Sequence, residues 1–186
     1  MLRLISKLYY KLIGWKLVDH FPKEIKKCVI IGAPHTSYLD FPIGLAGLKM
    51  QGLHIRYLAK RELFKFPFKF IFSKTGGIPV DRSKKSNLVD HMVQLFDESN
   101  ELLFAVAPES TRKMVDRWKT GFYHIALGAK VPIILGYLDY KNKLAGYGHV
   151  ILPSGDIDKD MQLIKEFYSS KAAKHPDKFN VDAIGA

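Results

Sequence analysis

The sequence contains little cysteine, no long apolar run and few acidic residues. Its single cysteine, Cys28, excludes an internal disulfide and favours a reducing compartment. Because Cys28 stands in an apolar segment, we expect a buried and unreactive thiol. A membrane-spanning helix needs about 20 largely apolar residues, and every apolar run here is far shorter, so no transmembrane span is predicted. Basic residues interrupt the apolar N-terminus at Arg3, Lys7 and Lys11, which argues against a cleavable signal peptide.

The shortage of acidic side chains leaves a strongly basic chain. There are 29 Lys and Arg against 18 Asp and Glu in 186 residues, a formal net charge of +11 at pH 7. Such a field favours anionic partners, which include nucleic acid, an anionic lipid surface and phosphorylated substrates. The length suits one domain, and the hydrophobic fraction of 47% is ordinary for a folded globular protein.

Residues 1 to 15 have the pattern of an amphipathic helix. On a wheel of about 100° per residue, one half is apolar and ends at Trp15, while the other half holds Arg3, Ser6, Lys7, Tyr10, Lys11 and Gly14. Two roles stay open for this helix. It packs on its own domain, as most amphipathic helices do, or it lies in a lipid headgroup layer with a basic polar face and aromatic flanks.

Strand and helix patterns alternate along the rest of the chain. This alternation predicts an α/β fold, a single domain with a mostly parallel, mixed sheet flanked by helices, plus the N-terminal amphipathic helix. The aromatic segment 64–73 fits either a strand or a short helix. We divide the chain into an N-terminal helical segment at 1–20, a main domain at 21–175 and a C-terminal tail at 176–186. Strands are expected at 26–32, 54–59, 76–80, 101–107, 131–140 and 143–152, the last two as a hairpin, and helices at 41–50, 86–100, 120–130 and 156–171.

His35 and Asp40 stand five positions apart, directly after an apolar run. The prolines on either side of this segment bias Ala33 and Phe41 toward extended backbone, so we expect a loop at the end of a strand. In a straight helix, positions five apart sit about 140° apart around the axis and do not meet, whereas a loop lets the carboxylate fold back onto the ring. An imidazole oriented in this way acts as a general base near neutral pH, since its unperturbed pKa is about 6.5.

Other roles for this pair are open from the residues alone. If the two side chains do not meet, His35 is an ordinary surface histidine. In that case Asp40 caps the N-terminus of the helix predicted after it. Metal binding is disfavoured because no second His or Cys stands at ligand spacing. The sequence also has no G-x-S-x-G elbow, so a base at His35 is expected to act on a hydroxyl supplied by a substrate.

Two further loops carry basic side chains after predicted strands. In Gly76-Gly77-Ile78-Pro79-Val80-Asp81-Arg82, the glycines permit a tight turn and the arginine can fork onto a phosphate. The segment Ala107-Pro108-Glu109-Ser110-Thr111-Arg112 follows a buried strand, so its polar side chains lie at a carboxyl end, where open α/β sheets bind ligands. Arg112 and the Thr111 hydroxyl are suited to clamp an oxyanion or phosphate. Taken singly, Asp81 and Arg82 fit an ordinary surface ion pair better than a phosphate site, and a solvated loop is a common role for a segment such as 107–112.

The order and spacing of these blocks resemble the lysophosphatidate acyltransferase family, within the glycerolipid acyltransferase superfamily. That family shows H-x4-D, a G-x-I-x-x-x-R-like second block, F-P-E-G-T-R and a V-P-I-x-P-like fourth block. The corresponding segments here are His35–Asp40, Gly76–Arg82, Ala107–Arg112 and Val131–Leu135. Lys60 matches the lysine that opens the second block. The resemblance covers roughly residues 28 to 140.

The resemblance implies an acyltransferase domain at 21–175 and a membrane-surface role for the helix at 1–20. It implies transfer of a fatty acyl group from a thioester, acyl-CoA or acyl carrier protein, to the hydroxyl of a lysophospholipid, above all lysophosphatidate to phosphatidate. No cofactor or metal is expected. The catalytic residues are then His35 and Asp40, and the substrate-binding residues are Lys60, Arg82, Glu109, Ser110, Thr111 and Arg112. Expected partners are the lysolipid acceptor, the acyl thioester and an anionic membrane surface, without nucleic acid. The expected location is peripheral, at the cytoplasmic face of the cell membrane.

Three positions depart from the family pattern and keep alternatives open. Ser110 stands where the family has glycine, Ala107 replaces its aromatic residue, and Leu135 replaces the proline of the fourth block. If position 110 needs a positive φ, serine costs about 1–2 kcal/mol there. An acyltransferase for a lysolipid without a phosphate monoester, such as an ornithine or amino lipid, therefore stays an alternative. From another class, the net charge keeps open a basic nucleic-acid-binding protein, although no recognition motif is evident.

Overall fold

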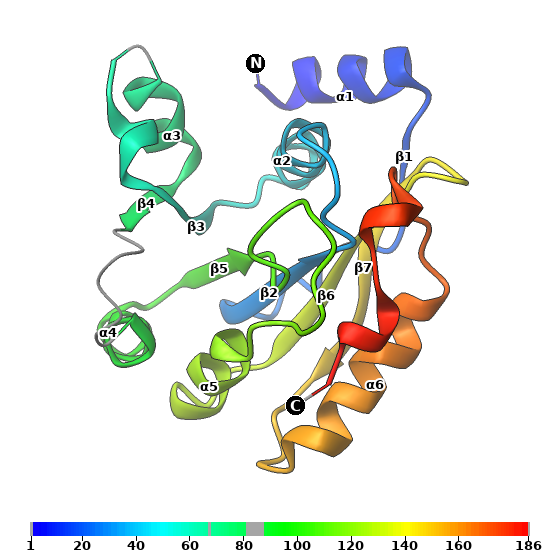
Figure 1. The fold of residues 1–186 in the computed structure, drawn as a ribbon. Helices are drawn as coiled ribbons and strands as arrows, with labels where there is room; N and C mark the ends of the chain where they lie inside the picture. The colour runs from blue at the N-terminus through cyan, green and yellow to red at the C-terminus, as the bar shows by residue number, and fades with distance from the viewer. Residues whose placement is uncertain (1, 67, 81–87, 186) are drawn as a thin grey trace.

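A mixed sheet with helices on both faces forms the protein. The computed structural model describes residues 2–66, 68–80 and 88–185, and within these ranges the sheet has seven strands in the order β1-β7-β6-β2-β5-β3-β4 (Figure 1). Neighbouring strands pair in parallel except β6 and β7, which form the predicted antiparallel hairpin. The strands are β1 (Lys16–Leu17), β2 (Lys27–Ala33), β3 (Ile55–Lys60), β4 (Gly77–Val80), β5 (Leu102–Val106), β6 (Ile133–Asp139) and β7 (Leu144–Ile151). The predicted α/β fold with a mostly parallel sheet is confirmed.

The central strand β2 is buried on both faces, as its continuous apolar sequence requires. Val29 and Ile31 face the core that α4, α5 and α6 cover, whereas Cys28 and Ile30 face the side of α2. Burial raises the pKa of the Cys28 thiol to about 12, in agreement with the inert thiol expected from the sequence. The helices are α1 (Leu2–Ile13), α2 (Asp40–Gln51), α3 (Lys69–Thr75), α4 (Leu88–Glu98), α5 (Gly121–Gly128) and α6 (Ile157–Ser169).

The N-terminal helix α1 packs on α2 by a narrow seam. The hydroxyl of Tyr10 donates to the carbonyl oxygen of Ile43 at 2.9 Å, and Tyr10 is almost fully buried. A Cβ at Gly47 would lie 2.6 Å from that hydroxyl, so the glycine permits the close approach of the two helices. The sequence placed Tyr10 on the polar half of the wheel, yet it is the residue that docks the helix. No helix in the described part of the chain has the length and apolar content to cross a bilayer.

Two sequence expectations need correction or completion. Phe41 is helical rather than extended, because Pro42 occupies the first turn of α2, where a missing N–H leaves no hydrogen bond unmade. The aromatic segment 64–73 is neither one strand nor one helix: it spans the end of a 3₁₀ turn (Arg61–Phe64) and most of α3. Gly76 ends α3 at φ +100°, and a Cβ there would collide with the carbonyl oxygen of Ile55, as expected of a tight glycine turn.

The C-terminal residues pack onto the domain instead of extending from it. After two 3₁₀ turns, Pro176–Lys178 and Val181–Ala183, the chain buries Ala183 and Ile184 in the core. The carbonyl oxygen of Ala183 accepts the N–H of Trp118 at 2.8 Å. The segment 176–186 is too short to show a periodic pattern of apolar residues, so its packing could not be predicted from the sequence.

Candidate active site

Four neighbouring parallel strands deliver functional side chains to one edge of the sheet. His35 follows β2, Glu109 follows β5, Tyr140 follows β6, and Lys60 is the last residue of β3. The carboxyl ends of parallel strands meet at the same edge, which is where open α/β sheets bind ligands. Arg82 comes two positions after β4 but lies outside the described residues, so its place in the site stays a prediction.

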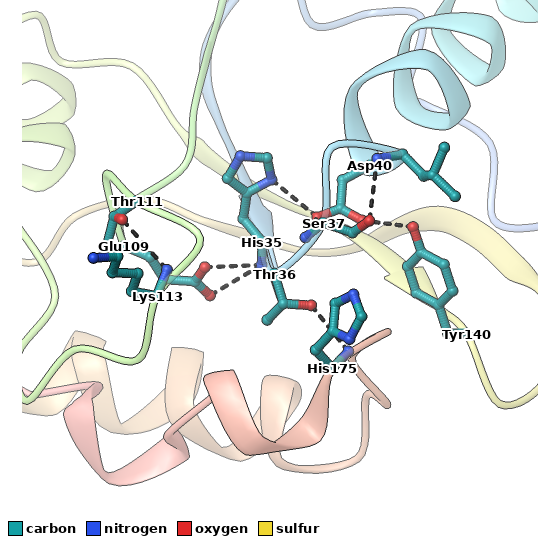
Figure 2. A network of polar contacts seen from close by, with 10 residues as sticks. His35, Thr36, Ser37, Asp40, Glu109, Thr111, Lys113, Tyr140 and His175 are labelled. Atoms are coloured by element: carbon teal, nitrogen blue, oxygen red, sulfur yellow. Dashed lines mark hydrogen bonds and ion pairs between the residues drawn. The ribbon is translucent and has the colours of Figure 1, made fainter.

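His35 and Asp40 are in direct contact. The Nδ1 atom of His35 lies 3.1 Å from Oδ2 of Asp40, across a loop that also ties the Ser37 N–H to the same oxygen at 2.9 Å (Figure 2). A carboxylate can only accept hydrogen bonds, so Nδ1 of the neutral imidazole carries the proton. The lone pair on Nε2 is then left for a substrate. Leu39 is the N-cap of α2 and no side chain caps it. The alternative that Asp40 is a helix cap is therefore wrong.

The Asp40 carboxylate stays ionised inside the protein. Burial alone raises its pKa, but the three hydrogen bonds that it accepts outweigh burial and hold the pKa below its usual range. The third of these bonds comes from Tyr140, whose hydroxyl lies 2.6 Å from Oδ1. A fixed negative charge beside an imidazole stabilises the cation that forms when the ring takes a proton.

Glu109 joins the third sequence block to the first. Both of its carboxylate oxygens lie within hydrogen-bond distance of the His35 backbone N–H, at 2.8 and 3.1 Å. The side chain is 5% exposed, and burial, with the nearby charge of Asp40, raises its pKa to about 8 although the His35 N–H opposes the shift. The carboxyl group of Glu109 thus holds the backbone of His35 in place. A direct contact of Glu109 with substrate stays a prediction.

The loop after Glu109 gives position 110 a backbone conformation that glycine adopts most readily. Ser110 has φ +58°, in the left-handed region that disfavours side chains. The next residue, Thr111, accepts the N–H of Lys113 at 3.3 Å through its hydroxyl oxygen and so shapes the same turn. The sequence departure at 110 therefore leaves the loop in its strained conformation rather than giving it another shape.

We expect Ser110→Gly to be more stable than Ser110→Ala by about 1 kcal/mol. Both variants lose the hydroxyl, but only glycine relieves the backbone strain, and part of that gain is offset by the larger conformational entropy of glycine in the unfolded state. Urea denaturation of the two variants measures this difference directly. Equal stabilities would show that the left-handed backbone at this position carries no strain.

Arg112 lies against the loop of the dyad. Its guanidinium carbon is 3.9 Å from the ring centroid of Tyr38, which belongs to the His35–Asp40 segment. Among the described residues, its buried Nε has no hydrogen-bond partner. Lys60 is exposed at the end of β3. Arg112 thus contacts the dyad loop and Lys60 lies at the same carboxyl edge of the sheet, while their binding of a substrate anion stays a prediction.

The sequence reasoning missed Tyr140 and the segment that closes over the loop. The backbone N–H of His175 donates to the Thr36 hydroxyl at 3.2 Å (Figure 2). Tyr140 had one signal, since it directly follows a strand parallel to β2, where site residues gather. Within the described ranges, no group of three or more His, Cys, Asp or Glu side chains is arranged to hold a metal ion.

Comparison with known proteins shows the family of this chain. The acyltransferase family model matches residues 16–135, which include every block named above. The chain belongs to the acyltransferase family. The curated 1-acyl-sn-glycerol-3-phosphate acyltransferase of Haemophilus influenzae is 31% identical over 134 residues, 67% of this chain. The match spans 54% of that relative, so the chain corresponds to about half of its length.

A solved acyltransferase shares the fold. The crystal structure of the 1-acyl-sn-glycerophosphate acyltransferase PlsC from Thermotoga maritima aligns with a TM-score of 0.64, covering 93% of this chain and 80% of that one. At 16% identity, this likeness concerns the fold alone. The family membership that the four blocks predicted is confirmed by the family model.

Proposed function

We propose that this protein moves a fatty acyl group from a thioester, acyl-CoA or acyl carrier protein, to the hydroxyl of a lysophospholipid at a membrane surface. Lysophosphatidate is the proposed acceptor and phosphatidate the product. The observation that carries the proposal is the contact of His35 Nδ1 with Asp40, which leaves Nε2 as a base in a member of the acyltransferase family. The name of the Haemophilus relative supports the choice of acceptor.

The proposed chemistry is direct transfer. Nε2 of His35 takes the proton of the acceptor hydroxyl while the oxygen attacks the thioester carbonyl. The tetrahedral intermediate then expels the thiolate, which takes the proton from the imidazolium. One ester bond forms, one thioester bond breaks, and no group on the enzyme is acylated. Cys28 is unsuited as a nucleophile because it is fully buried within β2 as a thiol of high pKa.

Arg112, Lys60 and Arg82 are the proposed ligands of the acceptor phosphate. Stacking on Tyr38 leaves the edge of the Arg112 guanidinium available, and its Nε is a buried donor without a partner among the described residues. A planar guanidinium fits a phosphate by paired hydrogen bonds. Thr111 and Ser110 hold the loop that carries Arg112, which is how we assign them to substrate binding.

Exposed apolar side chains support action at a membrane surface. Most of the apolar face of α1 is turned away from α2, leaving exposed Leu2, Leu4, Ile5, Leu8 and Leu12. Large apolar side chains are also exposed in and just before α3, namely Phe66 (95% exposed), Phe68, Phe70 and Ile71. The Lys74 ammonium lies 4.1 Å from the ring centroid of Phe70. Both helices lie toward the same end of the molecule in Figure 1.

Basic residues border both apolar surfaces, which matches an anionic headgroup layer. Arg3, Lys7 and Lys11 are exposed along α1, and Lys69 and Lys74 belong to α3. Each cation close to an anionic surface adds about 1 kcal/mol. We therefore place the protein peripherally, at the cytoplasmic face of the membrane, with α1 and the aromatic side chains of α3 in the headgroup layer.

We expect the double variant Leu8→Glu and Leu12→Glu to lose most of its binding to anionic vesicles, because two charges then enter the apolar face of α1. Pelleting with vesicles of phosphatidylglycerol and phosphatidylcholine measures the bound fraction. The matched control, Leu152→Glu and Leu163→Glu, changes two exposed leucines away from α1 and should bind like the parent. Equal binding of both variants would remove α1 from the membrane contact.

The identity of the acceptor is tested by offering lysophosphatidate and a lysolipid without a phosphate monoester to the purified protein with acyl-CoA. We expect phosphatidate to form and glycerol phosphate analogues to inhibit. Acylation of an ornithine or amino lysolipid alone, without inhibition by these analogues, would establish the alternative acceptor. DNA binding with steep salt dependence and no acyl transfer would establish the nucleic-acid alternative.

A further inference from the structure

Tyr140 lies where two distant parts of the chain meet the catalytic pair. Its hydroxyl donates to Oδ1 of Asp40 at 2.6 Å. Its ring packs edge-on against Trp15, with centroids 4.9 Å apart and planes at 85°. Its backbone N–H donates to the carbonyl oxygen of Ala172 at 2.9 Å, and the Lys174 ammonium lies 5.9 Å from its ring centroid.

The hydroxyl of Tyr140 completes the restraint on the Asp40 carboxylate. Oδ2 accepts from the His35 ring and from the Ser37 backbone, while Oδ1 accepts from Tyr140 (Figure 2). With donors on both oxygens, rotation of the carboxylate about its Cβ–Cγ bond breaks hydrogen bonds in a buried place. Without the hydroxyl, one oxygen of a buried anion has lost its donor and the carboxylate is free to turn from the ring.

We propose that Tyr140 is a positioning residue for the dyad, and that its packing on Trp15 makes the dyad geometry depend on the docking of the N-terminal segment. This inference rests on the proposed function. Trp15 is itself nearly buried and lies two residues after the end of α1, in the cluster that Tyr10 and Ile43 form between α1 and α2. A path of contacts therefore runs from the proposed membrane helix through Trp15, Tyr140 and Asp40 to His35.

A neighbouring tyrosine provides a matched comparison. Tyr137 lies in β6, three residues before Tyr140, which directly follows that strand. The Tyr137 hydroxyl also donates to a carboxylate, Oδ2 of Asp19, at 2.7 Å. Its ring packs on Phe167, on the α6 side of the sheet. The two tyrosines thus lie three residues apart in the chain and make the same type of hydrogen bond, and of the two only Tyr140 contacts the dyad.

The activity test compares Tyr140→Phe with Tyr137→Phe, using short-chain soluble substrates so that membrane binding does not enter the rate. We expect Tyr140→Phe to lower kcat about tenfold with little change in the acceptor KM, the size expected for one hydrogen bond to a charged group. Tyr137→Phe should keep the parental kcat. An unchanged kcat in Tyr140→Phe, or an equal loss in both variants, overturns the proposal.

The tautomer of His35 gives a second readout that needs no turnover. In protein labelled with ¹⁵N histidine, long-range proton–nitrogen spectra of the parent should show the proton of neutral His35 on Nδ1. In Tyr140→Phe we expect a mixture with the Nε2-protonated form, and in Tyr137→Phe the parental spectrum. An unchanged tautomer in Tyr140→Phe overturns the positioning role. If the parent itself transfers no acyl group, the proposed function fails while this spectrum still decides the role of Tyr140.

The link to the N-terminal segment is tested with Trp15. We expect Trp15→Ala to lower kcat on the same soluble substrates, Trp15→Phe to restore most of it, and the double variant Trp15→Ala with Tyr140→Phe to fall no further than Tyr140→Phe alone. Such non-additivity indicates that both side chains act through one contact. Losses that multiply in the double variant would separate Trp15 from the dyad.

Discussion

We expect His35→Ala to lower the kcat of acyl transfer by about 10²–10⁴-fold, the range typical of a lost general base. The acceptor KM should change little, because the proposed phosphate ligands Arg112 and Lys60 remain. The variant should also keep its fold. The His35 side chain is partly exposed, so its removal opens no core cavity, and the backbone N–H that binds Glu109 is retained by alanine.

The control for this variant is His91→Ala, which removes an exposed histidine on α4. Steady-state rates of thiol release with acyl-CoA and lysophosphatidate should match the parent for His91→Ala. A His35→Ala rate within a few-fold of the parent would mean that another group accepts the proton of the hydroxyl.

The second large effect concerns stability and pH. The pKa of Glu109 is about 8 in the folded protein because of burial, against an ordinary value of about 4.5. The folded state therefore binds a proton that the unfolded state has lost between these pH values. It follows that this carboxyl group stabilises the protein fully below pH 4.5, and that this contribution is lost as pH rises toward 8. The integrated loss is on the order of 5 kcal/mol.

We expect Glu109→Gln to remove this pH dependence, because the amide does not ionise and its oxygen still accepts the His35 N–H. Relative to the parent, the free energy of unfolding of this variant should rise steadily between pH 5 and pH 8. Urea titrations at four pH values measure it. The exposed Glu24→Gln serves as the control and should run parallel to the parent. A Glu109→Gln curve that also stays parallel to the parent would show that Glu109 titrates normally.

Much of the site could be predicted because it lies in loops after short, strongly apolar strands. The run from Cys28 to Ala33 marks the central strand, and the spacing of His35 and Asp40 needs a loop to bring them together, as found. The third block was expected at the carboxyl end of a buried strand, as found, but that this strand, β5, is the neighbour of β2 is seen only in the structure. At Ser110 the sequence left two outcomes open, a positive φ or another loop shape, and the structure has the positive φ.

The parts that could not be predicted depend on contacts between distant segments. A helical wheel finds the apolar half of α1 but not the neighbour that covers it, so it could not show that Tyr10 docks the helix while the leucines stay exposed. Tyr140 is separated from Asp40 by 100 residues, and no local pattern links them. The two-residue strand β1 is too short for any periodicity.

The central claim is that the acceptor hydroxyl attacks the thioester without an acylated enzyme, while His35 takes the proton of that hydroxyl. The most direct measurement is rapid mixing of purified protein with acyl-CoA, followed by detection of free thiol and of protein mass, with and without lysophosphatidate. We predict thiol release only when lysophosphatidate is present, in equal amount to phosphatidate formed, with the protein mass unchanged. A burst of thiol without acceptor, accompanied by an acylated protein, would contradict direct transfer and require a nucleophile on the enzyme.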